Sequence, residues 1–430
     1  MKKILLYSIL TLATKFAYSQ QISFDAKGII AISDADMAAS AFVDGKLFKE
    51  RGNKDFMSIV KLPIDKYSDE IKSLVVSNSS INSAKSIVIS PNHPIAYVVE
   101  TRGTTPETIT EIRNLYTGLP VGGYISVIDI SDLSQPKVLY KFPTGKNPTA
   151  IDISPNGEYL ALCSEEYGKE LQVLELDPTG KPVRIINKPQ NFQAGKISDI
   201  TWHPNNNFLV FTMEDSKEVG LLKVTRDGPT TKIIRLDIVG RTLKVGNLPS
   251  AGQFTPDGKY YLVPDIKSNI VNKSESGSDD FGDMFVLKFN LEGKSEHYLI
   301  TKTKIGETPT SFAISPDGSL VAVTNAKKSY FPWKNNETSK KASISLLKLS
   351  TDGSLNNVEE YEFDGILPKN ITFDKTGENI AVTVFDYFNL GKHFGGIEFW
   401  KVKNGEKPSL QKQDFKLFMP RGCHAIQIVK

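Results

Sequence analysis

The chain has 430 residues, of which 52 are basic and 49 acidic, so its formal net charge at pH 7 is only +3. That balance excludes the strongly basic surface that is typical of nucleic-acid-binding proteins. Aromatic residues make up 10%, apolar residues 40% and charged residues 23% of the chain, a composition that indicates a folded protein and excludes an intrinsically disordered one.

The N-terminal stretch MKKILLYSILTLATKFAYSQ has the pattern of a secretory signal peptide. Two lysines precede an apolar run from residue 4 to residue 13, and small residues follow at the spacing of a cleavage site. The run is too short to span a bilayer. We therefore predict that residues 1–19 are removed, that the mature chain starts at Gln20, and that it is exported to the periplasm or the extracellular medium without a membrane span. A buried N-terminal helix is the alternative.

The two cysteines, Cys163 and Cys423, lie in or beside predicted strands. Export permits a disulfide, but a secreted scaffold that depends on disulfides usually has more cysteines. We expect two buried thiols that pack as small apolar groups.

A repeat of about 50–65 residues organises most of the chain. Each copy has an apolar strand, a turn of the Pro-Asn/Asp-Gly type and a second strand rich in Val, Leu, Ala and aromatic residues. Proline sets φ at the first turn position, and Asn or Gly tolerates positive φ later in the turn. The six copies are SIVISPNHPIAYVVE, AIDISPNGEYLALCSE, DITWHPNNNFLVFTME, AGQFTPDGKYYLVPD, SFAISPDGSLVAVTN and NITFDKTGENIAVTV.

Two further strand-like stretches follow each pair. The third-strand segments are YISVIDIS, ELQVLELD, VGLLKVTR, DMFVLKFN, SISLLKLS and GIEFWKVK. Four antiparallel strands per repeat, arranged radially, are typical of a β-propeller.

The two ends of the chain supply one more unit. The segments GIIAIS (Gly28–Ser33), FMSIVKLP (56–63) and IKSLVVS (71–77) resemble second, third and fourth strands without a first, and the C-terminal CHAIQIV resembles the missing first strand. Pairing them covers an edge that would otherwise invite aggregation. The sequence thus predicts an all-β, seven-bladed β-propeller, closed by pairing of the C-terminal strand with the N-terminal blade, in one domain over residues 20–430.

Five insertions between second and third strands are predicted to project from one face of the ring. They cover residues 34–54, 102–123, 267–283, 326–342 and 386–395. Because long loops on a rigid scaffold often carry function, we expect the ligand on this face, over the central channel.

Aromatic residues are frequent in these insertions: Tyr116, Phe281, Tyr330, Phe331, Trp333, Phe385, Tyr387, Phe388, His393 and Phe394. Mixed with polar groups, they suit a small molecule, a glycan or a protein partner, so Tyr330 and Trp333 are candidate ligand-binding residues. The alternative is that large loops need a small core of their own.

Polar residues recur where the second strands end: Glu100, Arg102, Glu165, Glu166, Glu214, Asp215, Asp265, Lys267, Asn325, Lys327 and Asp386. Asp265 and Asn325 can simply accept hydrogen bonds from the next turn and end the strand. Glutamates are too long for that, so Glu100, Glu165 and Glu214 are predicted to face a shared cleft. Clustered carboxylates raise one another's pKa or hold a cation.

The residues before each first strand lie over the channel mouth, and the last such stretch, PRGCH, combines Arg421 and His424. Arginine binds carboxylates or phosphates with two hydrogen bonds, and histidine exchanges protons near neutral pH. Arg241 is predicted as a further cation near this mouth. A satisfied structural role for His424 is the alternative.

Other chemical motifs are absent from the sequence. It has no G-x-S-x-G, H-E-x-x-H, C-x-x-C or C-x-x-C-H motif. The acidic stretch SESGSDDFGD (274–283) is a weak candidate for Ca²⁺, but its spacing does not match an EF-hand loop, and we interpret it as a solvated loop. We expect no cofactor and no metal site.

The segments NPTAIDISPNGEYLALCS, PSAGQFTPDGKYYLVPD, TPTSFAISPDGSLVAVTN and LPKNITFDKTGENIAVTV resemble the lactonase-like and YVTN-type seven-bladed propellers. That group includes 6-phosphogluconolactonase-type and carboxymuconate cycloisomerase-type enzymes beside many exported propellers. The resemblance implies His, Arg and acidic residues at the channel mouth. This chain has Thr149, Ser250 and Thr310 at positions where a histidine would be sought, and the stretch from Arg421 to His424 comes nearest to the pattern.

Two functions remain open from the sequence. In the first, an exported monomeric binding or scaffold module holds a small molecule, glycan or protein on the loop-rich face. In the second, a lactonase-like hydrolase acts on a sugar-acid lactone, with water activated by His424, Glu165 or Glu214. The candidate ligand-binding residues are Glu100, Arg102, Arg241, Asp265, Asp386, Arg421, Tyr330 and Trp333.

Overall fold

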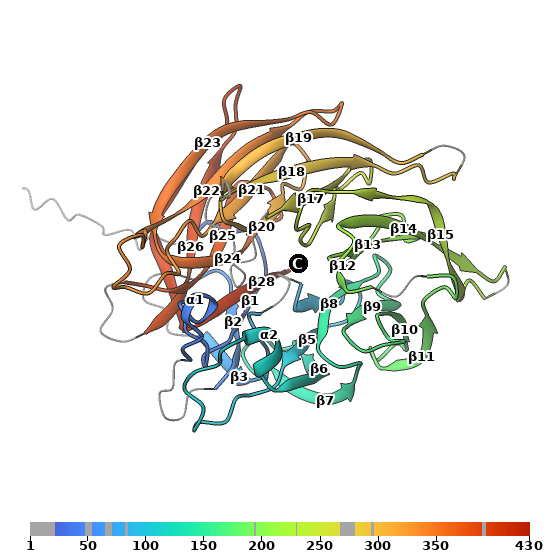
Figure 1. The fold of residues 1–430 in the computed structure, drawn as a ribbon, viewed down its shortest axis with the longest axis horizontal. Coiled ribbons are helices and arrows are strands. Elements are labelled where there is room, and N and C mark those ends of the chain that lie inside the picture. The colour runs from blue at the N-terminus through green and yellow to red at the C-terminus, as the bar shows by residue number, and fades with distance from the viewer. Residues whose placement is uncertain are drawn as a thin grey trace, which may run out of the picture.

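Seven four-stranded antiparallel sheets stand around a central channel (Figure 1). The computed structural model describes residues 22–47, 54–64, 71–81, 85–192, 195–228, 230–266, 280–293, 296–388 and 393–430. The arrangement confirms the predicted all-β, seven-bladed propeller. The predicted leader at residues 1–19 lies outside the described residues, so the division into a leader and one domain stays a prediction.

Each blade runs from an inner first strand to an outer fourth strand. Blades 1 to 3 are β4 (Ile87–Ile89), β5 (Ile95–Arg102), β6 (Val121–Asp129), β7 (Lys137–Pro143); β8 (Pro148–Ile153), β9 (Tyr159–Ser164), β10 (Leu171–Leu176), β11 (Pro182–Asn187); β12 (Ile197–Trp202), β13 (Phe208–Met213), β14 (Glu218–Arg226), β15 (Ile233–Lys244). Blades 4 and 5 are β16 (Gln253–Phe254), β17 (Tyr261–Asp265), β18 (Phe281–Lys288), β19 (Tyr298–Glu307); β20 (Pro309–Ile314), β21 (Leu320–Asn325), β22 (Lys341–Leu349), β23 (Leu355–Asp364). Blades 6 and 7 are β24 (Ile366–Phe373), β25 (Asn379–Asp386), β26 (Phe394–Lys403), β27 (Ser409–Pro420); β28 (Cys423–Val429), β1 (Gly28–Ser33), β2 (Phe56–Lys61), β3 (Ile71–Val75).

Blade 7 closes the ring as predicted. The C-terminal strand β28 pairs antiparallel with β1, with Gly28 opposite Val429 and Ile32 opposite Ala425, and the two strands lie side by side in Figure 1. Alternate side chains of β1 pack on different neighbours: Ile30 joins a core shared with blade 1, whereas Ile29 joins one shared with blade 6. This period of two is what an apolar strand buried on both faces requires.

The turns between first and second strands have the chemistry that the repeat indicated. In SPNG the Gly157 amide donates to the carbonyl of Ser154 at 2.8 Å, and Gly157 has a φ of +68°. A side chain at such a φ is strained, which explains the recurring glycine. These turns lie on one face of the ring, which we call the turn face, and the insertions lie on the opposite loop face.

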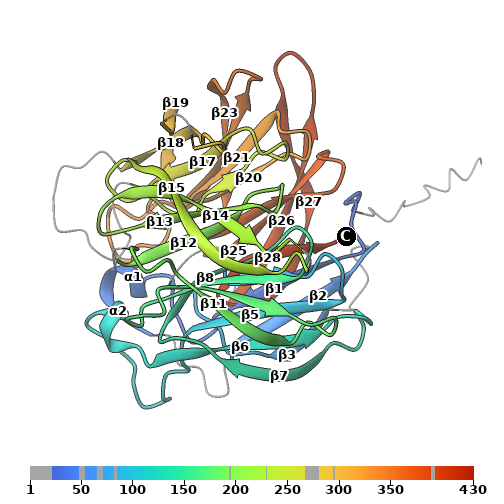
Figure 2. The same ribbon diagram turned by 90° about the vertical axis from the view of Figure 1, so that its right-hand side faces the viewer.

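Three of the insertions, over residues 34–54, 102–123 and 326–342, share a small core on the loop face, which we call the loop core. It contains Met37, Ala39, Ala41, Phe42, Leu47, Ile81, Ile112, Leu115, Leu119, Ala326, Tyr330, Phe331, Leu367 and Phe385. Two short helices, α1 (Ala41–Asp44) and α2 (Leu115–Gly118), contribute to it. Both helices lie on one side of the ring and the C-terminus on the other (Figure 2).

Both cysteines are buried and neither forms a disulfide, as expected. Among the described residues, no helix is long and apolar enough to cross a membrane.

Candidate functional site

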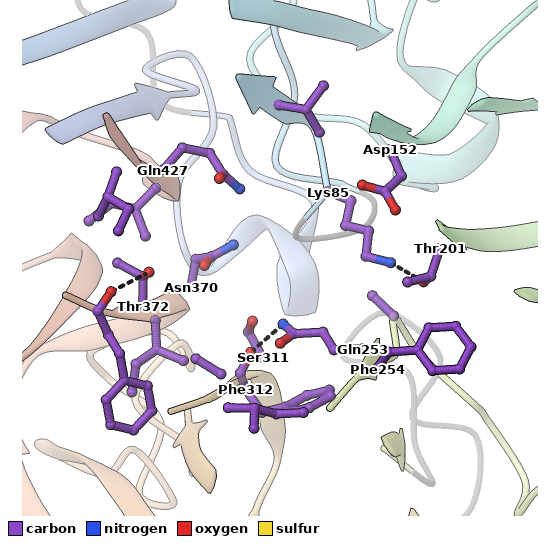
Figure 3. A pocket seen from close by; sticks show the side chains of 18 of the residues that line it. Lys85, Asp152, Thr201, Gln253, Phe254, Ser311, Phe312, Asn370, Thr372 and Gln427 are labelled. Atoms are coloured by element: carbon purple, nitrogen blue, oxygen red, sulfur yellow. Dashed lines mark hydrogen bonds between the residues drawn. The ribbon is translucent and has the colours of Figure 1, made fainter. Parts of the chain in front are cut away.

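The inner strands surround a cavity of about 670 Å³ in the central channel. Side chains alternate along a strand, so each first strand can direct polar groups toward the channel while the others pack between blades. The polar lining includes Lys85, Asp152, Thr201, Gln253, Asn370, Thr372 and Gln427 (Figure 3). The cavity extends to the exposed turn residues Pro204, Pro256 and Pro316, so solvent reaches it from the turn face.

An ion pair lies in the wall of this cavity. The Lys85 Nζ is 3.0 Å from the Asp199 Oδ2 and also donates to the hydroxyl of Thr201. The same Asp199 oxygen accepts the amide of Gly252 at 3.0 Å and lies 3.3 Å from the hydroxyl of Tyr261. The Asp199 side chain is fully buried. Burial raises the pKa of Asp199, and the nearby ammonium of Lys85 opposes that rise.

Asp152 supplies a carboxyl that lines the cavity. Its Oδ2 accepts the amide of Trp202 from blade 3 at 2.7 Å, which fixes the side chain between two blades. Burial raises the pKa of Asp152 to about 6, against the opposing charge of Lys85. A carboxyl with this pKa can accept or donate a hydrogen bond to a ligand near neutral pH.

Amide side chains complete the polar lining. The Gln253 Nε2 donates to the carbonyl of Phe312 at 2.9 Å, which holds its amide at the wall. Gln427 on β28 points toward the cavity from blade 7, across from Lys85 and Asp152 (Figure 3). Primary amides donate and accept hydrogen bonds at once, which suits hydroxyl groups.

The predicted glutamates lie on the loop face in a chain of paired charges, which we call the rim chain. Glu165 is 3.3 Å from Arg102 and accepts the amide of Asn147 at 2.7 Å. Lys196 lies between two carboxylates, 3.0 Å from Glu214 and 3.9 Å from Glu165. Glu165 and Glu214 are thus brought near each other, as predicted, but around a lysine that neutralises them.

His424 and Arg421 are buried beneath the loop face. The His424 Nε2 lies 2.8 Å from the Asn78 Oδ1, and because the Asn78 amide donates to two backbone carbonyls, this ring nitrogen must carry the proton. Burial, with the charge of Lys369 second, lowers the pKa of His424 to about 3. Arg421 donates to the carbonyl of Ala35. Both side chains therefore have structural partners, and His424 is 1% exposed.

The remaining predicted residues are dispersed. Arg241 lies on the outer strand β15 with its side chain 89% exposed, away from the channel mouth. Asp265 accepts, at 2.8 Å, the amide of Leu248, which lies before the first strand of its blade and not in the turn after Asp265. Tyr330 belongs to the loop core, whereas Trp333 is 58% exposed and packs on Phe388. Glu100 accepts the amide of Gly123 at 3.3 Å.

Asp386 forms a pair that sequence reasoning did not anticipate. Its Oδ2 lies 3.2 Å from the His393 Nδ1, and its Oδ1 accepts the amide of Tyr387 at 2.8 Å. The His393 side chain is 47% exposed on the loop face. Burial raises the pKa of Asp386, while His393 and Arg421 oppose that rise. A carboxylate that orients an exposed imidazole is an arrangement for moving protons.

The residues predicted from the sequence did not include Lys85, Asp152 or Asp199. The available signal was a charged residue within an apolar first strand, as in TAIDIS and DITW. A buried charge needs a partner, so the aspartates in these two strands predict a cation nearby in the channel wall.

The comparisons with known proteins show the fold. No protein-family model matches the sequence, and no curated protein matches it. Among solved structures, the periplasmic gluconolactonase PpgL of Pseudomonas aeruginosa is 12% identical, with a TM-score of 0.61 over 94% of this chain and 99% of that one. A Bacteroides uniformis protein provisionally assigned as a 6-phosphogluconolactonase is 13% identical, with a TM-score of 0.60 over 94% and 100%. A hypothetical selenium-binding protein of Sulfolobus tokodaii is 11% identical, with a TM-score of 0.60 over 94% of each chain.

These structural neighbours include 6-phosphogluconolactonase-like seven-bladed propellers, in agreement with the resemblance found in the sequence. At such low identities the likeness concerns the fold, because one propeller scaffold hosts many chemistries.

Proposed function

We propose that this chain is an exported binding module that holds a small hydroxyl-rich ligand, of the sugar or sugar-acid class, in the central channel. The observation that carries the proposal is the convergence of Lys85, Asp152, Gln253, Asn370 and Gln427, which come from five blades, on one cavity. The volume of about 670 Å³ suits a small molecule. The position differs from the sequence expectation, which put the ligand above the channel on the loop face.

The chemistry of the lining favours hydroxyl groups. Amides and carboxyls exchange hydrogen bonds with hydroxyls in both directions, and the partly buried ring of Phe254 offers an apolar surface to the faces of a sugar ring. Because Lys85 is already paired with Asp199, the cavity has little net positive charge to demand an anion. Export is supported by the leader-like N-terminal sequence and is tested by mass analysis of the secreted chain, with Gln20 expected as its first residue.

Isothermal titration of residues 20–430 against sugars, sugar acids and sugar lactones tests the proposal. We expect one class to bind with one-to-one stoichiometry, and Gln427→Ala to weaken that binding at least tenfold because it removes a cavity amide. Gln411→Ala, the same change on the outer strand β27, is the matched control and should leave binding unchanged. No binding by any class, or equal effects of the two substitutions, would contradict the proposal.

Lactone hydrolysis is the second candidate, and the pair of Asp386 and His393 favours it. In this reaction the His393 Nε2 takes a proton from water, the water oxygen attacks the lactone carbonyl, and the ring C–O bond breaks with protonation of the leaving oxygen. The choice of sugar lactones as substrates follows from the gluconolactonase among the structural neighbours. Turnover of sugar lactones that falls at least 100-fold in His393→Gln would support it, and unchanged turnover would exclude it.

A further inference from the structure

Three aspartates meet at the loop-face end of blade 7, a group that we call the aspartate cluster. Asp34 and Asp36 follow β1, and Asp55 directly precedes β2, so the cluster stands at both ends of the insertion over residues 34–54. One carboxylate oxygen from each residue lies within 4.8 Å of the others. Asp34 is 1% exposed and Asp55 7% exposed.

Backbone donors hold the three carboxylates in place. The Asp34 Oδ2 accepts the amide of Ser80 at 2.7 Å and its hydroxyl at 2.9 Å. Asp55 accepts the amides of Ala35 and Asn78, at 3.2 and 3.3 Å. The Asp36 Oδ2 accepts an amide at 3.3 Å from the neighbouring insertion. The protein therefore holds the three carboxylates in place before any ligand binds.

One oxygen of the cluster lacks a donor. The Asp34 Oδ1 is buried, and within the described part of the chain no hydrogen-bond partner reaches it. A buried carboxylate oxygen left without a partner costs free energy comparable to a lost charged hydrogen bond. The carboxyls of Asp34 and Asp36 also lie within hydrogen-bonding reach of each other, so two acceptors face each other whenever both groups are ionised.

The electrostatics agree with a missing positive charge. Burial, followed by the charges of Asp36 and Asp55, raises the pKa of Asp34 well above its usual value. Burial and the charge of Asp36 likewise raise the pKa of Asp55 to about 8, with Glu100 contributing. Lys369 interacts with Asp34, but one ammonium faces three carboxyls and can offset only part of their negative charge, and burial lowers the pKa of Lys369 to about 8.

We propose that Asp34, Asp36 and Asp55 form a binding site for a divalent cation of the Ca²⁺ class. The three ligands are hard carboxylate oxygens, which Ca²⁺ accepts in irregular geometry at 6–8 coordination, and carbonyls or water can supply the rest. No histidine or thiolate belongs to the cluster, which disfavours Zn²⁺.

The cation would fasten the cap of the channel. The insertion that the cluster brackets includes α1, and the ring of Phe42 in α1 lies 5.2 Å from the ammonium of Lys369, whose neighbour Asn370 lines the cavity. A cation that ties the start of this insertion to the start of β2 would hold α1 over the loop-face end of the channel.

The decisive measurement is cation binding by the mature chain after removal of metals with a chelator. We expect one equivalent of Ca²⁺ by titration calorimetry and by elemental analysis after dialysis, with weaker binding of Mg²⁺ and none of Zn²⁺ at the cluster. Ca²⁺ at a hundred times its Kd should raise Tm by a few degrees. A wild-type chain that neither takes up Ca²⁺ nor gains stability overturns the proposal without any variant.

Substitutions locate the site. Asp36→Asn, at the least buried ligand, should weaken Ca²⁺ binding at least tenfold, and the combined change Asp34→Asn with Asp55→Asn should abolish it. Asp132→Asn, which alters an exposed turn carboxylate bonded to Ser134, is the matched control and should bind Ca²⁺ as wild type does. Circular dichroism establishes folding of each variant. Should the double variant not fold, Asp36→Asn decides; unchanged Ca²⁺ binding in folded Asp36→Asn overturns the assignment.

Discussion

The loop face carries two groups of carboxylates that differ in their burial and in the positive charge beside them. In the rim chain over blades 1 to 3, Glu165 and Glu214 are partly exposed, and Arg102 and Lys196 lie beside them. In the aspartate cluster at blade 7, the carboxylates are largely buried and face one another. Each rim glutamate faces a cation, whereas in the described part of the chain the Asp34 Oδ1 of the cluster has no donor.

The comparison shows that acidic residues alone do not identify a site. The glutamates were predicted because they recur at strand ends, yet the cations beside Glu165 come from the neighbouring blades, Arg102 from blade 1 and Lys196 from blade 3. Exposed ion pairs of this kind contribute about 0–1 kcal/mol each. Burial without sufficient positive charge is far more costly, and such positions are often functional.

The largest expected loss of stability comes from removing β28, the first strand of blade 7, which carries the aspartate cluster. Deletion of residues 421–430 removes β28, exposes the backbone edge of β1 and uncovers apolar side chains such as Ile30. We expect loss of a cooperative thermal transition by circular dichroism. Removal of Lys430 alone, which is exposed and outside β28, is the control and should leave the transition intact. A truncated chain that still melts cooperatively near the wild-type Tm would show that blade 7 is not needed to close the ring.

The next effect concerns the buried histidine near the cluster. His424 has a folded-state pKa of about 3 against 6.5 in the unfolded chain, so as the pH falls the unfolded state takes up the proton first. The part of the free energy of unfolding that depends on a neutral His424 is fully present above pH 6.5. It declines between pH 6.5 and 3 and is lost below pH 3. At about 1.4 kcal/mol per pKa unit, wild type should lose about 4–5 kcal/mol relative to His424→Gln across that window. Urea unfolding of both proteins at pH 7.5 and pH 3.5 measures it; parallel losses would refute the assignment.

Two lysines that bridge blades give the sharpest comparison. Lys85 and Lys196 each lie 3.0 Å from a carboxylate, but the Asp199 side chain is fully buried and that of Glu214 is 27% exposed. Lys85→Met leaves a buried carboxylate without its cation and should cost about 3–5 kcal/mol of unfolding free energy. Lys196→Met should lower the free energy of unfolding by less than about 1 kcal/mol, and high salt should reduce even that loss because it screens the exposed pair. Equal losses in urea unfolding would mean that distance rather than burial governs these pairs.

The candidate site was predicted less well than the fold. Asp386 was selected from its place at a strand end, but its partner His393, seven residues later in the same insertion, was grouped only with the aromatic residues. Lys85 precedes its strand by two residues and pairs with an aspartate 114 positions later, a separation that no local pattern reveals. Tyr330 had two open interpretations, and the packing of three insertions into the loop core placed it in that core.

The architecture could be predicted from the sequence, because strand alternation, Pro-Asn/Asp-Gly turns and the repeat length are local properties that recur in the blades. The closure by CHAIQIV could be predicted as well, since an unpaired first strand at one end matches a missing first strand at the other. Which charges meet depends on the folded structure. Lys196 lies between the rim glutamates, whereas Asp34, Asp36 and Asp55 converge from the two ends of the insertion over residues 34–54. Burial and neighbouring charge depend on contacts between blades rather than on position along the chain.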